Sequence, residues 1–234
     1  MVSDGKVSIR DFTATSARLK VSSLEEQLLN LRTGTICALN EMLDLKDLDT
    51  GLHSSRLAEW AIRVGELLEM SESDLVDLEA AAILHDIGKN GVPEAILTKP
   101  GQLSSDERKL IEKHSEYGWA ILRVIPGFEK SALLVLHHHE RMDGTGYPSR
   151  LSDVEIPLGS KIISVIDSFD AMISDRCYRK GFPVEEAVRR LHASTGTQFD
   201  QNVVRLFVGI AAHDLADVNQ AVELLEQSTV LPTR

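Results

Sequence analysis

The chain has 234 residues, of which 43% are hydrophobic and 26% charged, and its formal net charge at pH 7 is -11. This length suits one domain with a buried core, and no apolar run is long enough to cross a membrane. The acidic balance argues against non-specific binding of DNA or RNA, which depends on clustered Lys and Arg. The polar N-terminus lacks a signal peptide's apolar core, and Cys37 and Cys177 form no CxxC motif, so a cytoplasmic protein without disulfides is expected.

Helical spacing dominates the chain and strand-like alternation is scarce, which predicts an all-α fold. Residues 1–22 are expected to form an N-terminal arm. Residues 23–45 carry a stripe of apolar residues that polar Thr35 interrupts, at Leu24, Leu28, Leu31, Ala38, Met42 and Leu45. This pattern predicts an amphipathic helix that packs on its own domain or forms a homodimer with a second copy.

The remaining chain predicts a catalytic domain over residues 46–212 and a C-terminal helix and tail over 213–234. Ser104 and Glu107 have the spacing of a capping box, and Gly144, Gly146 and Pro148 should end any helix in an ordered loop. Apolar periodicity predicts helices over residues 50–70, 73–87, 104–125, 129–140, 158–175, 183–194, 199–212 and 214–227.

Two histidine clusters about fifty residues apart stand out. The first is His85-Asp86-Ile87-Gly88-Lys89, and the second is His137-His138-His139-Glu140 followed by Asp143-Gly144-Thr145-Gly146-Tyr147-Pro148. Metal-competent side chains also fall on the inward-facing stripes of four separate predicted helices, namely His53, His85, His114 and Asp167. Imidazoles and carboxylates gathered in this way suit a site for more than one divalent ion.

A single histidine on an apolar helix face is more often a hydrogen-bonded core residue than a metal ligand. Burying the whole set without a cation, however, would leave several polar groups desolvated at a cost of about 1 to 3 kcal/mol each. The set contains no thiolate, which favours iron or manganese, with zinc, nickel or cobalt as alternatives in vitro. His192 and His213 lie outside the set, and the role of His137 stays open because adjacent helical residues point about 100° apart.

Basic residues gather near these motifs in an otherwise acidic chain, which fits a small anionic ligand. They are Lys89, Lys99, Arg141, Arg176, Arg179 and Lys180.

The ordered motifs resemble the HD-GYP family, a branch of the HD phosphohydrolase superfamily whose members hydrolyse cyclic di-GMP. The resemblance covers roughly Lys46 to Phe207. It includes HSSR at 53–56, HDIGK at 85–89, GVP at 91–93, KPG at 99–101, His114, HHHERMDGTGYP at 137–148, VIDSFDAM at 165–172, SDR at 174–176 and GTQFD at 196–200. It implies an HD-domain helical bundle that encloses a multinuclear metal site.

The resemblance also implies roles for individual residues. The implied metal ligands are His53, His85, Asp86, His114, His138, His139 and Asp167, with Asp86 bridging two ions. Asp49 stands where some members have a glutamate that binds a third ion. Lys89 corresponds to a lysine that contacts substrate phosphate, and Tyr147 is the tyrosine of the GYP signature. Arg176 and Arg179 match a basic pair that holds phosphate or guanine, while Cys177 and Gln201 replace prolines common in the family.

The function implied is a bacterial second-messenger hydrolase. A hydroxide bridging two divalent ions would attack a phosphorus of cyclic di-GMP, giving pGpG and then GMP, with Asp86 and Lys89 as the catalytic residues. Three alternatives stay open: hydrolysis of another nucleotide such as a mixed cyclic dinucleotide, a receptor that binds cyclic di-GMP without cleaving it, and a module whose GYP loop docks a GGDEF-type or other signalling protein. Residues 1–45 are too few for a receiver, GAF or PAS domain, so regulation is expected to be absent, in trans, or mediated by the first helix.

Overall fold

The protein is described here from a computed structural model. It covers the backbone of residues 9–45, 51–175 and 180–229, and the side-chain surroundings of residues 21, 23–45, 54–175 and 180–215. Regular structure in these ranges is helical, with one isolated bridge between Thr195 and Phe199, which confirms the all-α prediction. No helix within the described ranges is both long and apolar enough to span a bilayer.

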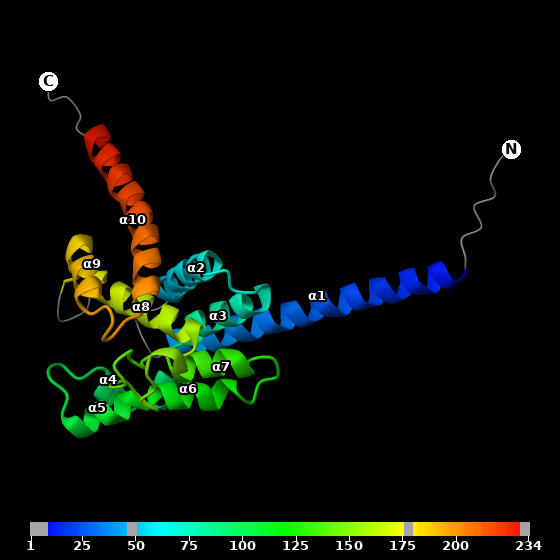
Figure 1. The fold of residues 1–234 in the computed structure, drawn as a ribbon, viewed down its shortest axis with the longest axis horizontal. Helices are drawn as coiled ribbons and strands as arrows, with labels where there is room; N and C mark the ends of the chain where they lie inside the picture. The colour runs from blue at the N-terminus through cyan, green and yellow to red at the C-terminus, as the bar shows by residue number, and fades with distance from the viewer. Residues whose placement is uncertain (1–8, 46–50, 176–179, 230–234) are drawn as a thin grey trace.

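The helices form a body from which the first and last project (Figure 1). In chain order they are α1 (Ile9–Asp44), α2 (Gly51–Leu67), α3 (Glu72–Leu84), the 3-10 helix η1 (Ile87–Gly91), α4 (Glu94–Leu97), α5 (Ser105–Glu112), α6 (His114–Leu122), α7 (Glu129–Leu136), the 3-10 helix η2 (Asp153–Glu155), α8 (Leu158–Ile173), α9 (Val184–Ala193) and α10 (Gln201–Thr229).

Several boundaries differ from those predicted by periodicity. The helix expected to start at residue 23 begins at Ile9, and the helices expected over 199–212 and 214–227 are one continuous helix, α10. The helix expected over 104–125 is divided at Lys113 into α5 and α6. α7 ends at Leu136, so the second histidine cluster lies beyond it. The capping box at Ser104 is confirmed, because both of its hydrogen bonds are present.

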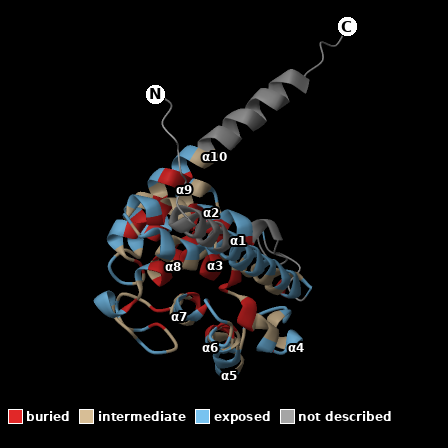
Figure 2. Cartoon of the chain, turned by 90° about the vertical axis from the view of Figure 1, so that its right-hand side faces the viewer, coloured by how far each residue is buried: buried red, intermediate tan, exposed pale blue. Residues whose placement is uncertain are grey.

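The core lies where α2 packs against α3, α8 and α10. Three aromatic rings meet edge to face there, with centroid distances of 5.9 Å for Trp60 and Phe169, 5.5 Å for Trp60 and Phe207, and 5.0 Å for Phe169 and Phe207. Offset edge-to-face contacts of this kind add to the stability gained by burying the rings. Buried residues gather along the inner sides of α3 and α8 (Figure 2). This packing fixes the two helices near His85, at the end of α3, and near Asp167, on α8.

The backbones of η1 and α6 approach each other closely. A Cβ on Gly88 would lie 1.8 Å from the carbonyl oxygen of His114 and 2.4 Å from the backbone nitrogen of Gly118. No side chain fits at such distances, so glycine is required for the backbones to meet. The glycine of the HDIGK motif therefore sets the distance between the first histidine cluster and His114.

Candidate metal centre

The first part of the site lies at the C-terminal end of α3. His85 is the C-cap residue of this helix, is 1% exposed, and follows a helix that buries Leu78, Ala82 and Leu84. Its Nε2 atom lies 3.3 Å from Oδ2 of Asp86 and 3.7 Å from Oδ1 of Asp167, which comes from α8. Two carboxylates therefore meet one imidazole at the junction of α3 and α8.

His114 joins this group because the helix is interrupted at Lys113, between α5 and α6. As the first residue of α6, it is 2% exposed and places its Nε2 atom 3.5 Å from Oδ1 of Asp86. The same Nε2 atom lies 3.3 Å from Nε2 of His138. The break in the helix thus directs this imidazole toward both histidine clusters.

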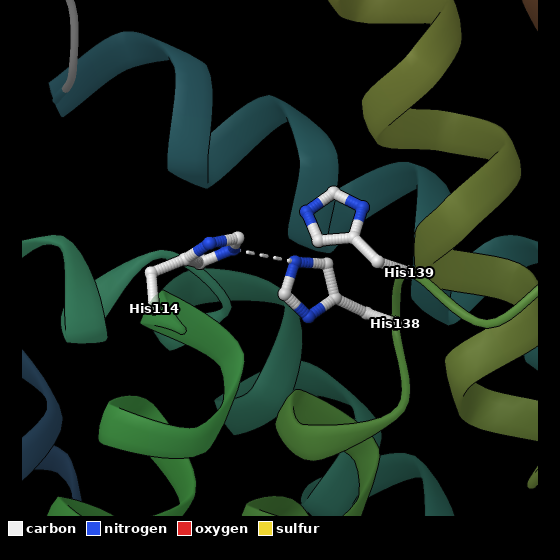
Figure 3. A group of neighbouring side chains, drawn as sticks. All are labelled: His114, His138 and His139. Carbon is white, nitrogen blue, oxygen red and sulfur yellow. Dashed lines mark hydrogen bonds between the residues drawn. The ribbon is translucent and has the colours of Figure 1, made fainter. Parts of the chain in front are cut away.

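His138 and His139 complete the group from the segment after α7. One ligand atom from each of His114, His138 and His139 can be chosen so that all three lie within 4.8 Å of one another, and the rings converge in Figure 3. The rings of His138 and His139 are 3.9 Å apart between centroids. Because these residues lie beyond the helix, the 100° rotation expected between neighbours on a helix does not separate them.

Backbone carbonyls orient three of the imidazoles in the same way. The Nδ1 atoms of His85, His114 and His138 lie 2.8, 2.7 and 2.6 Å from the carbonyl oxygens of Ala82, Ile111 and Val135, each three residues earlier. A carbonyl only accepts, so each Nδ1 must carry the proton and donate it. In the neutral ring Nε2 then keeps its lone pair, and metal-binding histidines are typically oriented by such a bond.

The electrostatic state of the histidines fits the same role. Burial lowers the pKa of His114 and lowers that of His138 well below its usual value. Burial, together with nearby His114, also lowers the pKa of His139 to about 3. These three imidazoles are therefore neutral at pH 7. The facing Nε2 lone pairs of His114 and His138 would repel each other, and a shared cation removes that repulsion.

The carboxylates are charged in the same setting. Burial opposes ionisation of Asp86, but Lys89 and His85 hold its pKa well below the usual value. The pKa of Asp167 is also lowered, because a hydrogen bond from His85 outweighs burial. Burial disfavours a charged His85, yet Asp86 and Asp167 raise its pKa to about 10. The protonated His85 ring thus places a positive charge between these two carboxylates. A divalent cation bound there would replace the Nε2 proton, and the neutral ring would then offer the Nε2 lone pair.

Lys89 and Tyr147 border the metal centre. The Nζ atom of Lys89 lies 2.7 Å from Oδ2 of Asp86. The Tyr147 ring lies on His139, with centroids 4.8 Å apart and planes inclined by 33°. Burial and the charge of Asp86 raise the pKa of Tyr147, so its phenol stays protonated and can donate a hydrogen bond.

The loop that carries Tyr147 is held by a buried carboxylate. Glu140 is 3% exposed and accepts hydrogen bonds from the backbone N–H groups of Ser149, at 2.7 Å, and Leu151, at 3.1 Å. A Cβ on Gly146 would lie 2.5 Å from the backbone nitrogen of Arg141, so glycine is required here too. The sequence prediction included Glu140 in the motif but gave it no role, although a carboxylate beside three histidines was a visible signal.

An ion pair on α8 was also missed by the sequence prediction. Asp170 is fully buried, forms an ion pair with Arg56 of α2, and accepts a hydrogen bond from the Ser174 hydroxyl at 3.2 Å. Asp170 lies one turn after Asp167 on α8, so this pair fixes the helix that presents Asp167. The placement of Asp170 on the same face as Asp167 was the signal available in the sequence.

The structure brings together six of the predicted metal ligands, His85, Asp86, His114, His138, His139 and Asp167. His53 lies in α2, but its side chain is outside the described residues, as are Asp49, Arg176 and Arg179. His192 and His213 are exposed, away from the buried cluster. The Nδ1 atom of His137 lies 3.6 Å from Oε1 of Glu140, so this histidine contacts the carboxylate that holds the loop.

The expected basic pocket is only partly present. Lys99 forms an ion pair with Glu107, with N···O distances of 2.7 and 2.8 Å. Arg141 pairs with Asp143 inside its own loop, at 2.9 Å. Both cations are committed to local acidic partners, which the one-dimensional count of basic residues did not reveal. Among the described residues of that basic group, Lys89 contacts the metal centre, through Asp86.

A cavity of about 740 Å³ opens between the start of α6 and the loop that carries Tyr147. This volume is within the usual range for small-molecule sites. Tyr147 lines the cavity and also contacts His139, so the cavity adjoins the metal centre. Its lining includes both signs of charge, from Lys109, Glu112, Lys113, Glu116 and Arg150.

Comparison with known proteins places this geometry in context. The family profile described as HD domain matches residues 37–203, more than half of the chain. A cyclic di-GMP phosphodiesterase of Thermotoga maritima is 40% identical over 172 residues, which cover 73% of this chain and 47% of that protein. The 3'3'-cGAMP-specific phosphodiesterase 3 of Vibrio cholerae is 37% identical over 165 residues, covering 70% and 36%. The chain thus spans less than half the length of either relative.

Solved structures agree with the fold. The crystal structure of a cyclic GMP-AMP specific phosphodiesterase of V. cholerae superposes with a TM-score of 0.61 and 21% identity, and the match covers 85% of this chain and 53% of that one. At this identity the likeness concerns the fold alone. It confirms the predicted helical bundle.

Proposed function

This chain belongs to the HD domain family, in its HD-GYP branch, and on that premise we propose that it is a metal-dependent phosphodiesterase that opens cyclic di-GMP to pGpG and then GMP. The observation that carries the proposal is the convergence on Asp86 of three buried imidazoles, His85, His114 and His138, together with the partly exposed His139 and Asp167. Relatives named cyclic di-GMP phosphodiesterases support the choice of substrate.

Six described side chains would hold the metal: His85, Asp86, His114, His138, His139 and Asp167. We propose His53 as a seventh ligand. Asp86 is placed to bridge two ions, because its two carboxylate oxygens contact different histidines, Oδ2 at His85 and Oδ1 at His114. Divalent ions bound here would supply an activated water and would neutralise charge on the phosphate. The absence of thiolate from this ligand set supports iron or manganese.

The remaining residues act on the substrate. Lys89 lies at Asp86 and, on moving a short distance, can offset charge on the non-bridging phosphate oxygens. Tyr147 presents a protonated phenol between the metal centre and the cavity, where it can orient a phosphate or a base. We assign Arg176 and Arg179 to further contacts with phosphate or guanine, and Asp49 to a third ion, on the resemblance alone.

Metal analysis together with product analysis tests the proposal. Protein purified without oxygen and loaded with iron(II) or manganese(II) should convert cyclic di-GMP to pGpG. Chromatography measures the appearance of this product. Asp86→Ala should lose bound metal and all hydrolysis while keeping its helical circular dichroism spectrum. The control Asp106→Asn removes an exposed acidic charge on α5 and should retain both. Full turnover by metal-free Asp86→Ala would contradict the mechanism.

A second variant separates substrate contact from metal binding. Lys89→Ala should keep its metal but lower kcat by about 100-fold to 1000-fold, the usual effect of removing one group that stabilises transition-state charge. Lys130→Ala, an exposed lysine of α7 that pairs with Asp74, is the matched control and should change kcat little. Loss of metal from Lys89→Ala would show that Lys89 supports the ligands instead.

Hydrolysis of 3'3'-cGAMP is the second candidate function, because relatives 32–37% identical carry that name. Comparing kcat/KM for the two cyclic dinucleotides with one metal-loaded preparation decides between them. Tight binding of cyclic di-GMP without product would instead favour a receptor. A GGDEF-type partner for the GYP loop stays a proposal that pull-down with a purified diguanylate cyclase domain would test.

A further inference from the structure

An apolar seam runs along α1 on a side that does not face the helical body. It consists of Val21, Leu24, Leu28, Leu31, Thr35, Ala38 and Met42, followed directly by Leu45. The steps between them alternate strictly between three and four residues, the heptad spacing of a coiled coil. Val21, Leu24, Leu28, Leu31 and Met42 are between 53% and 68% exposed. Large apolar side chains at this exposure and in this order are typical of an interface.

A different side of α1 attaches the helix to the body. Leu43 is 2% exposed, and Ile36 and Leu39 pack against the core. Arg32 contacts the carbonyl oxygen of Gly127 and the carboxylate of Asp77. At 100° of rotation per residue, the helix face that carries these four attachment residues is turned by roughly 90° from the face that carries the seam. Attachment to the body therefore leaves the seam uncovered.

We propose that the seam pairs with the same seam of a second copy of this chain in a parallel two-stranded coiled coil. The repeat is sustained over about three and a half heptads, which exceeds what a helix covering a globular core requires. α1 projects from the body as a single helix, so the partner helix meets no domain along the N-terminal half of the seam (Figure 1). A seam of this spacing is complementary to itself, which makes an identical chain the fitting partner.

The residue types at the seam favour two parallel strands. Leucine occupies three of the four d positions, Leu24, Leu31 and Leu45, while β-branched Val21 and Thr35 occupy a positions. Such a distribution favours a parallel dimer, and a single polar a position sets the register. In register, the two Thr35 residues share a layer, and each hydroxyl is already satisfied by the carbonyl oxygen of Leu31 at 2.8 Å.

The charges that flank the seam agree with this register. In a parallel coiled coil, a g position faces the e position five residues later on the partner. In the sequence, Lys20 precedes Glu25 by five residues, and Glu41 precedes Lys46 by five. Both pairs are of opposite charge in the sequence, which is the pattern expected for an in-register parallel pair; Lys46 and the side chain of Lys20 lie outside the described residues.

The dimer would also be connected to the metal centre. α1 contacts α3 and η1, the elements that precede and follow Asp86. The proposed dimer would therefore be joined by direct packing to the segments on either side of Asp86.

Measurement of mass in solution tests the proposal. The intact chain at tens of micromolar should have about twice its chain mass of 25.8 kDa by light scattering. Leu28→Glu introduces a charge into the seam at a site 66% exposed, where glutamate is a good helix former, and should give a monomer of unchanged helicity. Asn30→Glu adds the same charge on the opposite side of α1 and should stay dimeric. A monomeric wild-type chain, or a fully dimeric Leu28→Glu, would overturn the proposal.

Cross-linking tests the orientation. In a background of Cys37→Ser and Cys177→Ser, Leu24→Cys should form an intermolecular disulfide under mild oxidation, because parallel d positions face each other. Asn30→Cys, on the polar side, should not. A dimeric Leu24→Cys protein without a disulfide would overturn the parallel arrangement.

Discussion

The metal centre and α1 are both helical regions, but they differ in how closely neighbouring elements pack against them. At the metal centre, backbones approach so closely that Gly88 and Gly146 leave no room for a Cβ, and the imidazoles of His85, His114 and His138 are buried. On α1, a Cβ at Gly34 would meet nothing within 4 Å, and the apolar seam faces outward. Three- and four-residue spacing produces both surfaces. Spacing alone therefore predicts a stripe, and the packing of neighbouring elements decides whether it is a core or an interface.

Gly88→Ala is expected to have the largest effect, because it tests the close packing at the metal centre. The added Cβ would overlap the carbonyl oxygen of His114, and backbone cannot yield as a flexible side chain can. We expect a loss of about 3 kcal/mol or more in the free energy of unfolding, at the upper end of overpacking effects. Denaturant unfolding and metal analysis should show a less stable protein that no longer retains metal. Stability and metal content like those of the wild type would mean that the two backbones can separate freely.

Removing the charge of Glu140 should have a smaller, local effect. In Glu140→Gln one amide group replaces an acceptor oxygen, so the N–H of Ser149 or Leu151 loses its partner. Leaving a buried donor unsatisfied costs about 1 to 3 kcal/mol. Hydrogen exchange should accelerate at these two amides, while His114, His138 and His139 still bind metal. Unchanged exchange would show that the loop is held by other contacts.

The attachment of α1 is expected to contribute less. Arg32→Ala removes an ion pair with Asp77 at 3.0 Å and a contact of the guanidinium with the Phe128 ring at 4.6 Å. Since the Arg32 side chain is only 18% exposed, we expect a loss of about 1 to 2 kcal/mol, above that of a fully exposed pair. Thermal unfolding measures the loss, with Arg189→Ala, whose side chain is 76% exposed, as the control. An equal effect of both variants would contradict the role of Arg32 as an anchor.

Gly34→Ala should have the smallest effect and the opposite sign. The position is helical and open, so alanine meets no atom and removes the helical penalty of glycine. We expect a gain of about 1 kcal/mol in helix stability. A higher melting temperature with unchanged metal content would sharpen the contrast with Gly88→Ala. Destabilisation by this change would reveal a contact at Gly34.

The sequence by itself determined the helical class, the approximate place of most helices, and the residue types of the metal centre. These follow from apolar periodicity and from the chemistry of imidazole and carboxylate groups, which are local properties of the chain. The sequence also indicated that His192 and His213 do not belong to the metal-ligand set. The predicted boundaries differed at the break before His114, where tertiary packing overrides local helix preference. They also differed at α1 and α10, which are longer or more continuous than predicted and project from the body.

Only the tertiary structure decided how the polar residues are distributed among partners. It directs the Nδ1 atoms of His85, His114 and His138 to backbone carbonyls, and it uses Glu140 to hold the loop of Tyr147. It also commits Lys99 and Arg141 to local ion pairs, which one-dimensional charge counting cannot foresee. The physical reason is that hydrogen bonds and ion pairs depend on distances of a few ångströms between residues far apart in sequence, whereas periodicity records only the face on which each residue lies.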